Sequence, residues 1–222
     1  MIFFDIDGTL IDHLSASAAA SLIFFDRFPG AIPCTRSEFP AIWEGCLEKH
    51  FARFSRGEIS LWEQRRARIR EVFAAPDMPE DETDSRYRSF TREYEALTQA
   101  YSDVAACLEA LTGQSLGIIS NGPREQQVGK LQRAGLLQYF SVMVYSQDVG
   151  LAKPAPGVFL EACRQAGKSP ENCTYIGDNA ESDIVPSRAL GMRGVHLSRT
   201  GNSPMNPPVI STLYNLVPAL MR

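Results

Sequence analysis

Two carboxylates stand two residues apart near the start of the chain, in the segment Asp5-Ile6-Asp7-Gly8-Thr9-Leu10. Side chains two residues apart in a strand point to the same side, so both acids would face one site. Gly8 then permits a sharp turn of the backbone. Such a pair of acids is suited to binding a hard cation, or to a nucleophile working beside a general acid or base. The alternative is that these residues only mark the turn that ends a strand.

Two further polar clusters are suited to binding a phosphate group. Ser120-Asn121-Gly122 follows the apolar run 116–119 and offers a hydroxyl, an amide and an accessible backbone N–H to phosphate oxygens, although the segment is also typical of a turn. Lys153-Pro154 lies just before a helix that we expect to begin near Pro156. A loop lysine is usually solvated, but here the cation and the helix dipole would both favour an anion.

A fourth cluster, Gly177-Asp178-Asn179 with Asp183 beyond it, follows the apolar run 173–176. Asp178 could complete a metal site begun by Asp5, or one of these acids could cap a helix. All four clusters follow a strand or open a helix, and the carboxyl ends of parallel strands share one edge of a sheet, so we expect the clusters to converge. The chain has no P-loop and no Gly-x-Gly-x-x-Gly, which disfavours nucleoside triphosphate and dinucleotide sites.

The elements that would position these clusters alternate along the chain. Short apolar runs predict strands at residues 1–6, 115–119, 142–145, 173–176 and 194–197. Helical spacing of apolar residues predicts helices at 103–111, 124–134, 157–166 and 181–190. Alternation of strand and helix is typical of an α/β fold, so we expect a doubly wound parallel sheet with helices on both faces.

Residues 13–95 interrupt this alternation and predict an inserted all-helical domain, with the α/β core formed by 1–12 and 96–222. Helices are expected at 14–28, 39–54, 61–73 and 85–97, separated by joints rich in Pro, Gly and Asp. Because both connections leave from the carboxyl ends of the strands, we expect a mobile lid there. Candidates to contact a substrate are Trp43, Arg53, Trp62 and Arg65, each of which could instead lie in the core or on the surface of the insertion.

Composition excludes several classes of protein. A formal net charge of -4, with no run of Lys and Arg, disfavours binding to nucleic acid. Five scattered cysteines without a Cys-x-x-Cys pair indicate reduced thiols. Acids within the N-terminal apolar run argue against a signal peptide, and the longest apolar stretch, 16–25, is too short to span a bilayer. We therefore expect a cytoplasmic protein with no membrane partner.

Taken in order, the four clusters resemble the motifs of the haloacid dehalogenase-like (HAD) hydrolase superfamily. The matching residues are Asp5-x-Asp7-Gly8-Thr9, Ser120 with Asn121, Lys153, and Gly177-Asp178 followed by Asp183. The resemblance spans nearly the whole chain, and the insertion is similar to the family's helical cap of the first type. It implies a Rossmann-like core and an enzyme of the phosphatase type, because the family's dehalogenases have no acid at the position of Asp7.

The resemblance also implies a role for each residue. Asp5 would attack phosphorus and form an aspartyl phosphate, while Asp7 would protonate the leaving group and then activate water. Ser120 and Asn121 would hold the transferred phosphate, and Lys153 would offset its charge. Such a scheme suits phosphoryl transfer, which mainly needs in-line positioning and stabilisation of charge.

A Mg²⁺ cofactor is implied as well, held by Asp5, the backbone carbonyl of Asp7, and Asp178. The ion would reduce the repulsion between anionic Asp5 and an anionic substrate. Asp183 would position metal-bound water or Lys153. The segment 55–60 is loosely similar to cap regions of nucleotidase-like and sugar-phosphatase-like members of the family.

The expected partner is a small phosphorylated metabolite, and the expected activity is hydrolysis of its phosphate monoester. The sequence leaves the oligomeric state open. One alternative is a phosphomutase of the same fold, which would return the phosphoryl group to a substrate. Another is a non-catalytic, phosphate-binding regulatory protein, against which the intact acids Asp5, Asp7 and Asp178 and the intact Lys153 argue.

Overall fold

A computed structural model describes residues 1–206 and 208–221 of the chain. Two compact units are formed, one by Met1–Asp12 with Gln99–Arg222 and the other by His13–Thr98. No helix in the described part of the chain is long and apolar enough to cross a membrane.

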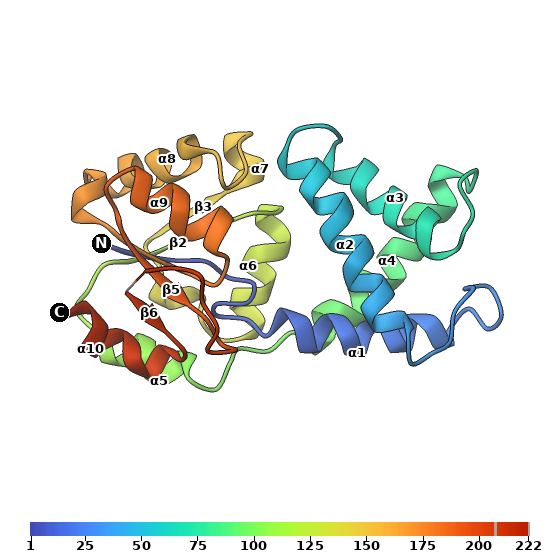
Figure 1. Ribbon diagram of the computed structural model, residues 1–222, viewed down its shortest axis with the longest axis horizontal. Helices are drawn as coiled ribbons and strands as arrows, with labels where there is room; N and C mark the ends of the chain where they lie inside the picture. Colours follow the sequence, from blue (N-terminus) through green and yellow to red (C-terminus); the bar gives the residue numbers. More distant parts are fainter. Residues whose placement is uncertain (207, 222) are drawn as a thin grey trace. The chain divides into compact units, whose positions relative to one another are not determined.

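The first unit is built on a parallel sheet (Figure 1). Its strands are β1 (Ile2–Phe4), β2 (Leu116–Ser120), β3 (Val142–Tyr145), β4 (Thr174–Gly177), β5 (Arg193–Leu197) and β6 (Val209–Ile210). All neighbouring strands pair in parallel, in the order β3-β2-β1-β4-β5-β6. The winding direction reverses between β1 and β4, which is where open α/β sheets bind ligands. The doubly wound fold predicted from the sequence is thus confirmed. Strand β6 was not predicted, because two residues carry no periodic signal.

Helices cover both faces of this sheet. Helices α5 (Val104–Ala110), α6 (Arg124–Arg133) and α10 (Leu216–Leu220) contribute to one hydrophobic cluster with Ile2 and Phe4 of β1. Helix α8 (Pro156–Ala166) contributes to a second cluster with Phe3. Successive residues of β1 therefore point to opposite covered faces, which explains why the whole strand is apolar.

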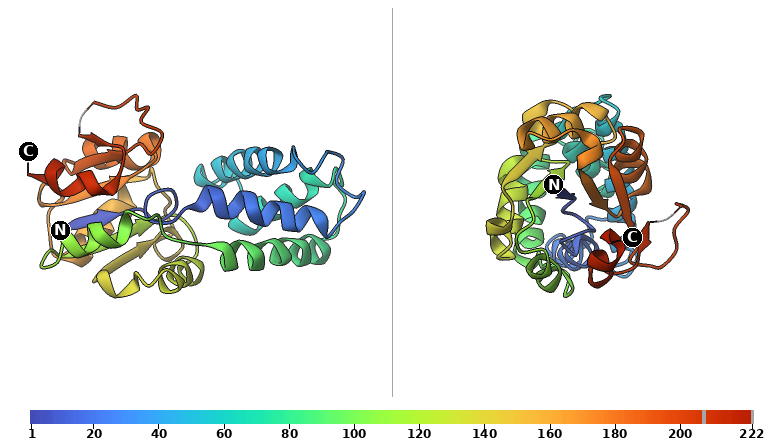
Figure 2. Two further views of the ribbon diagram at one scale, coloured as in Figure 1. Left: turned by 90° about the horizontal axis from the view of Figure 1, so that it is seen from below. Right: turned by 90° about the vertical axis from the view of Figure 1, so that its left-hand side faces the viewer.

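The remaining short elements join the strands to these helices. They are α7 (Ser146–Val149), α9 (Val185–Ala189), 3₁₀ turns at Leu137–Tyr139, Pro170–Asn172 and Leu213–Asn215, and a π-helical turn at Ala180–Ile184. The predicted helix at 181–190 is thus a π-helical turn followed by a short α-helix. Figure 2 shows α5 and α10 lying side by side, in agreement with the contacts between them.

The second unit is a bundle of four helices, α1 (His13–Asp26), α2 (Phe39–Ser55), α3 (Leu61–Val72) and α4 (Glu80–Leu97). Aromatic rings fill its core: the ring centroids of Trp43 and Phe90 lie 4.1 Å apart, and those of Phe24 and Trp43 lie 5.4 Å apart. Trp43 has no exposed surface and belongs to the core of the bundle, whereas Trp62 is 44% exposed.

Local sequence signals account for the helix boundaries in this bundle. Helix α3 begins with a capping box, in which Ser60 Oγ accepts a hydrogen bond from Glu63 N and Glu63 Oε2 accepts one from Ser60 N. Helix α4 begins five residues before the predicted start at 85, because its acid-rich first turn suits the positive end of the helix dipole. It continues past the expected limit of the insertion at residue 95 and ends at Leu97.

The chain leaves and re-enters the first unit at one place. Asp12 N donates to Gln99 O at 2.9 Å, Ile11 forms an antiparallel bridge with Ala100, and Tyr101 N donates to Leu10 O at 3.1 Å. The outgoing and returning segments are therefore hydrogen-bonded to each other. This pairing begins only a few residues after the acid pair that follows β1.

Candidate active site

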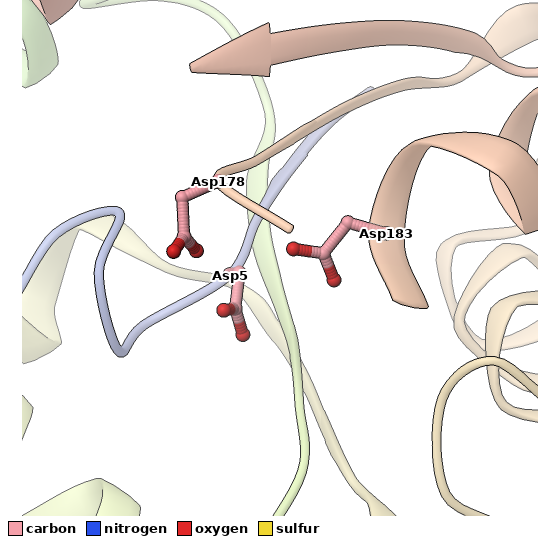
Figure 3. A group of neighbouring side chains, drawn as sticks. All are labelled: Asp5, Asp178 and Asp183. Atoms are coloured by element: carbon pink, nitrogen blue, oxygen red, sulfur yellow. The ribbon is translucent and has the colours of Figure 1, made fainter. Parts of the chain in front are cut away.

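Three carboxylates meet where the sheet reverses its winding direction. Asp5 directly follows β1, and its N–H still donates to Ile176 O in β4 at 2.9 Å. Asp178 directly follows β4, and Asp183 lies on the π-helical turn beyond it. One oxygen of each carboxylate lies within 4.8 Å of those of the other two (Figure 3). The structure thus brings together acids from two separate predicted motifs, the first and the fourth.

Two glycines allow the backbone to approach these acids. Gly8 has a φ of +81°, and a Cβ atom there would lie 2.2 Å from Asp178 Oδ2. At Gly177 a Cβ would lie 2.3 Å from Asp183 Oδ2. Any side chain at either position would push a carboxylate out of the cluster, so close approach requires both glycines, and the positive φ of Gly8 is a second reason at that position.

Lys153 is the cation of the cluster. Its Nζ lies 2.7 Å from Asp5 Oδ1 and 2.7 Å from Asp183 Oδ1, and it donates to the hydroxyl of Tyr175 at 2.9 Å. Burial works to lower the pKa of Lys153, but the attraction of Asp183 and Asp5 outweighs it and holds the pKa above its ordinary value. The ammonium group therefore remains charged at neutral pH.

The acids carry more negative charge than Lys153 offsets. Burial raises the pKa of Asp5 to about 6; Lys153 opposes this shift, and the nearby carboxylates of Asp183 and Asp7 add to it. Burial and the carboxylates of Asp5 and Asp183 raise the pKa of Asp178 to about 8. A divalent cation would favour the ionised forms, and carboxylate oxygens are the ligands that Mg²⁺ prefers. The residues present therefore fit a magnesium ion.

Asp183 is held in place by three donors. Asn179 Oδ1 caps the π-helical turn by accepting from the N–H groups of Glu181 and Ser182. Asp183 Oδ1 accepts from Lys153 and lies 3.2 Å from the hydroxyl of Tyr175, and its Oδ2 accepts from Asn179 N at 3.1 Å. This arrangement suits a residue that positions Lys153. π-helical turns are often found at functional sites.

The Ser120-Asn121 cluster lies next to the lysine loop. Ser120 ends β2, is buried, and its Oγ accepts from Gln127 Nε2 at 2.9 Å. Asn121 Oδ1 accepts from Lys153 N at 2.8 Å, and its Nδ2 donates to Lys153 O at 3.0 Å. The side chain of Asn121, which the sequence assigned to phosphate binding, is thus occupied in fastening the Lys153 loop to the end of β2.

The carboxylate of Asp7 contacts two residues that were missing from the predicted site. Lys130 Nζ lies 2.6 and 2.7 Å from its two oxygens, and Gln127 Nε2 lies 3.0 Å from Oδ2. Both residues come from α6 and are buried. The sequence did offer a signal for them. Gln127 and Lys130 are three residues apart on the helix that follows Ser120, on its core-facing side, where apolar residues are usual.

Tyr175 and His196 are further contacts that sequence reasoning missed. The hydroxyl of Tyr175 lies 3.0 Å from Ile119 O, in addition to its contact with Lys153. His196 Nε2 lies 2.9 Å from Asp178 O, and its Nδ1 lies 2.6 Å from Ser203 Oγ. Both residues are interior strand positions, and nothing in their local sequence distinguishes them from ordinary core residues.

Several solved structures share this fold. The putative HAD-hydrolase YfnB from Bacillus subtilis superposes with a TM-score of 0.84 at 23% identity, over 100% of this chain and 98% of that one. A HAD phosphatase from Thermococcus onnurineus gives 0.72 at 27% identity, over 99% and 96%. An L-2-haloacid dehalogenase from Xanthobacter autotrophicus gives 0.74 at 18% identity, over 99% and 97%. The fold alone therefore does not separate phosphatases from dehalogenases.

Three relatives in sequence are named as phosphatases. A phosphoglycolate phosphatase from Salmonella paratyphi A is 30% identical over 99% of this chain and 91% of its own length. A phosphoserine phosphatase from Thermus thermophilus is 28% identical over 93% and 91%. A glyceraldehyde 3-phosphate phosphatase from Methanopyrus kandleri is 35% identical, with this chain spanning about half (49%) of its length. The family model for haloacid dehalogenase-like hydrolases matches residues 1–191. With its acids, lysine and glycines converging at the reversal point of this sheet, the chain is a hydrolase of the haloacid dehalogenase-like family.

Proposed function

We propose that this hydrolase is a Mg²⁺-dependent phosphatase that cleaves small phosphate monoesters through an aspartyl phosphate on Asp5. The observation that carries the proposal is the cluster itself, in which buried Asp5 faces Asp178 and is held by Lys153. Asp7 supports the phosphatase assignment over the dehalogenase one, because the expulsion of a halide needs no proton donor. The names of the phosphoserine and phosphoglycolate relatives agree with it.

The reaction divides into two steps. In the first, an oxygen of Asp5 attacks phosphorus, the ester P–O bond breaks, and Asp7 gives a proton to the departing alkoxide. In the second, Asp7 accepts a proton from a water molecule that attacks the same phosphorus. The acyl phosphate bond breaks, inorganic phosphate is released, and the carboxylate of Asp5 is regenerated.

The other residues bind and orient. Lys153 restrains the Asp5 carboxylate at 2.7 Å and supplies fixed positive charge beside the phosphate. Ser120 offers its hydroxyl to a phosphate oxygen, and Asn121 holds the Lys153 loop through its two backbone hydrogen bonds. Mg²⁺, held by Asp5, Asp178 and the carbonyl of Asp7, would offset the repulsion between the nucleophile and the anionic substrate.

The proposed substrates are small phosphorylated metabolites. The relatives are named for phosphoserine, phosphoglycolate, glyceraldehyde 3-phosphate and an N-acylneuraminate 9-phosphate, all of which are such esters. We assign selection among them to the inserted bundle of residues 13–98, because the chain enters it only a few residues after Asp7. All five cysteines are free thiols, which supports a cytoplasmic location.

The test is the Asp5→Asn variant, assayed with Mg²⁺ on nitrophenyl phosphate and on a panel of phosphorylated metabolites. We expect activity to fall by at least about a thousandfold, because the amide is a poor nucleophile. Asp77→Asn, a matched change in an exposed loop, should leave activity unchanged. A folded Asp5→Asn protein with near-normal turnover would refute the proposal.

The same panel separates the alternatives. Activity that depends on a bisphosphate activator would indicate a phosphomutase, and phosphate binding without any turnover would indicate a regulatory protein. Exhaustive chelation should abolish hydrolysis, and added Mg²⁺ should restore it. Full activity in metal-free enzyme would contradict the proposed cofactor.

A further inference from the structure

Helix α6 supplies two buried polar side chains to the carboxylate of Asp7. Gln127 and Lys130 lie one helical turn apart on α6 and are 2% and 4% exposed. A buried lysine costs free energy unless its charge is paired, and a buried amide costs free energy unless it is hydrogen-bonded. Both costs are offset here by contacts with Asp7 and with the end of β2. These side chains are therefore positioned for the site rather than for the packing of the helix alone.

Gln127 connects the two halves of the proposed site. Its Nε2 lies 2.9 Å from Ser120 Oγ, 3.0 Å from Asp7 Oδ2 and 3.0 Å from Asn121 O. These contacts determine the orientation of the amide, because the flipped group would place Oε1 against the Asp7 carboxylate and the Asn121 carbonyl, neither of which can donate. Within the described part of the chain Oε1 itself has no hydrogen-bond partner. The donor end of Gln127 thus carries all of its polar contacts.

Lys130 contacts the same carboxylate. Its Nζ is within 2.7 Å of both oxygens of Asp7, so the carboxylate is held by a forked contact as well as by the amide. The Asp7 side chain is 28% exposed, so it reaches the solvent-accessible side of the cluster while its partners are buried behind it. Such a contact removes the rotational freedom that an acid on a loop would otherwise have.

We propose that Gln127 and Lys130 are positioning residues that hold Asp7 beside Ser120, so that the acid meets the leaving group of a phosphate bound there. The inference rests on the proposed function, because it assumes that Asp7 is the general acid. Neither residue is required to touch the substrate. Their effect should appear in the steps in which Asp7 transfers a proton.

The experiment compares two substrates with different leaving groups. Nitrophenolate departs without a proton, whereas an alkoxide such as that of glycerol phosphate needs one. Loss of a positioned acid should therefore lower kcat/KM more for the alkyl ester than for the aryl ester, because kcat/KM reports the first step, whereas both esters share the second step. We expect Lys130→Met and Gln127→Leu each to reduce the alkyl-to-aryl ratio of kcat/KM by about tenfold, a part of the 10²–10⁴ that general acid catalysis contributes. The inhibition constant of inorganic phosphate should change little.

Three controls define the interpretation. Lys130→Arg retains a cation and should recover part of the ratio. In an Asp7→Asn background, Lys130→Met should cause no further change in the ratio, since the residue it positions is gone. Lys168→Met removes the same charge from an exposed loop and should leave both substrates unaffected.

The outcomes separate this inference from the proposed function. If Asp7→Asn lowers the ratio but Lys130→Met and Gln127→Leu do not, the inference is wrong and the function stands. If Asp7→Asn leaves the ratio unchanged, the general-acid role itself fails. A rise in KM and in the inhibition constant of phosphate would make Lys130 a phosphate ligand instead. A higher alkyl-to-aryl ratio in Lys130→Met would also overturn the inference, because it would mean that Lys130 opposes proton donation by Asp7. Should Lys130→Met fail to fold, Gln127→Leu and Lys130→Arg decide the question.

Discussion

Without a bound metal ion, the stability of the protein should depend strongly on pH. In the metal-free cluster the pKa of Asp178 is raised from 3.8 to about 8, and that of Asp5 is raised to about 6. As pH rises above about 4, these carboxyls ionise in the unfolded chain while they remain protonated in the folded one. The folded state then binds more protons, so its stability falls with increasing pH until the folded pKa values are reached.

The size of the effect follows from the two shifts. Each pH unit in which only the unfolded state is ionised costs about 1.4 kcal/mol per group. Between about pH 5 and about pH 8, Asp178 would contribute on the order of 4 kcal/mol and Asp5 about 1 kcal/mol. For a chain of this length each kcal/mol corresponds to about 2–4 °C, so the Tm should fall by on the order of 10 °C.

The assay is thermal denaturation followed by circular dichroism in excess chelator, at a series of pH values. Asp178→Asn should remove most of the slope, because the amide has no proton to lose. Asp77→Asn, in an exposed loop, should retain the wild-type slope. Saturating Mg²⁺ should flatten the wild-type curve above about pH 6, because the ion stabilises the ionised carboxylates. Parallel curves for wild type and Asp178→Asn would refute the reasoning.

Three further perturbations follow from individual contacts. Gly8→Ala should abolish the Mg²⁺-induced rise in Tm and lower kcat by at least about tenfold, because its Cβ would lie 2.2 Å from Asp178 Oδ2; a normal metal response would contradict this. Asn121→Ala should lower kcat/KM by about tenfold, because it releases the Lys153 loop. Asn121→Asp keeps only the acceptor of the two hydrogen bonds, so its kcat/KM should lie between those of the wild type and Asn121→Ala. Trp43→Ala should cost about 3–5 kcal/mol in denaturant unfolding, and a cost below about 1 kcal/mol would argue against its place in the bundle core.

Much of the fold could be predicted because its signals are local. Alternating apolar runs and helical periodicities identified the parallel sheet and the helical insertion, and the structure confirms this fold class. The errors fall where a local signal is weak. The two-residue strand β6 has no period, the start of α4 depends on charge at a helix end, and the π-helical turn at Ala180–Ile184 depends on the cap from Asn179.

The polar residues of the candidate site were also recognisable from sequence as a group, because each stands at the end of a predicted strand or before a helix. Parallel strands bring their carboxyl ends to one edge, and in the structure Asp5, Asp178 and Lys153 do lie in contact or within a few ångströms. This convergence needs only the strand directions and the order of the motifs. It does not depend on the packing of any particular side chain.

By itself, then, the sequence determined the doubly wound architecture and the set of polar residues at the edge of the sheet that carries the candidate site. Only the tertiary structure decided which partner each of them has. Asp7 meets Lys130 from 123 positions along the chain, and Asn121 turns its amide to the backbone of Lys153 rather than outward. Such pairings depend on helix register, burial and loop geometry, which are set by packing across the sheet and have no counterpart in the local sequence pattern.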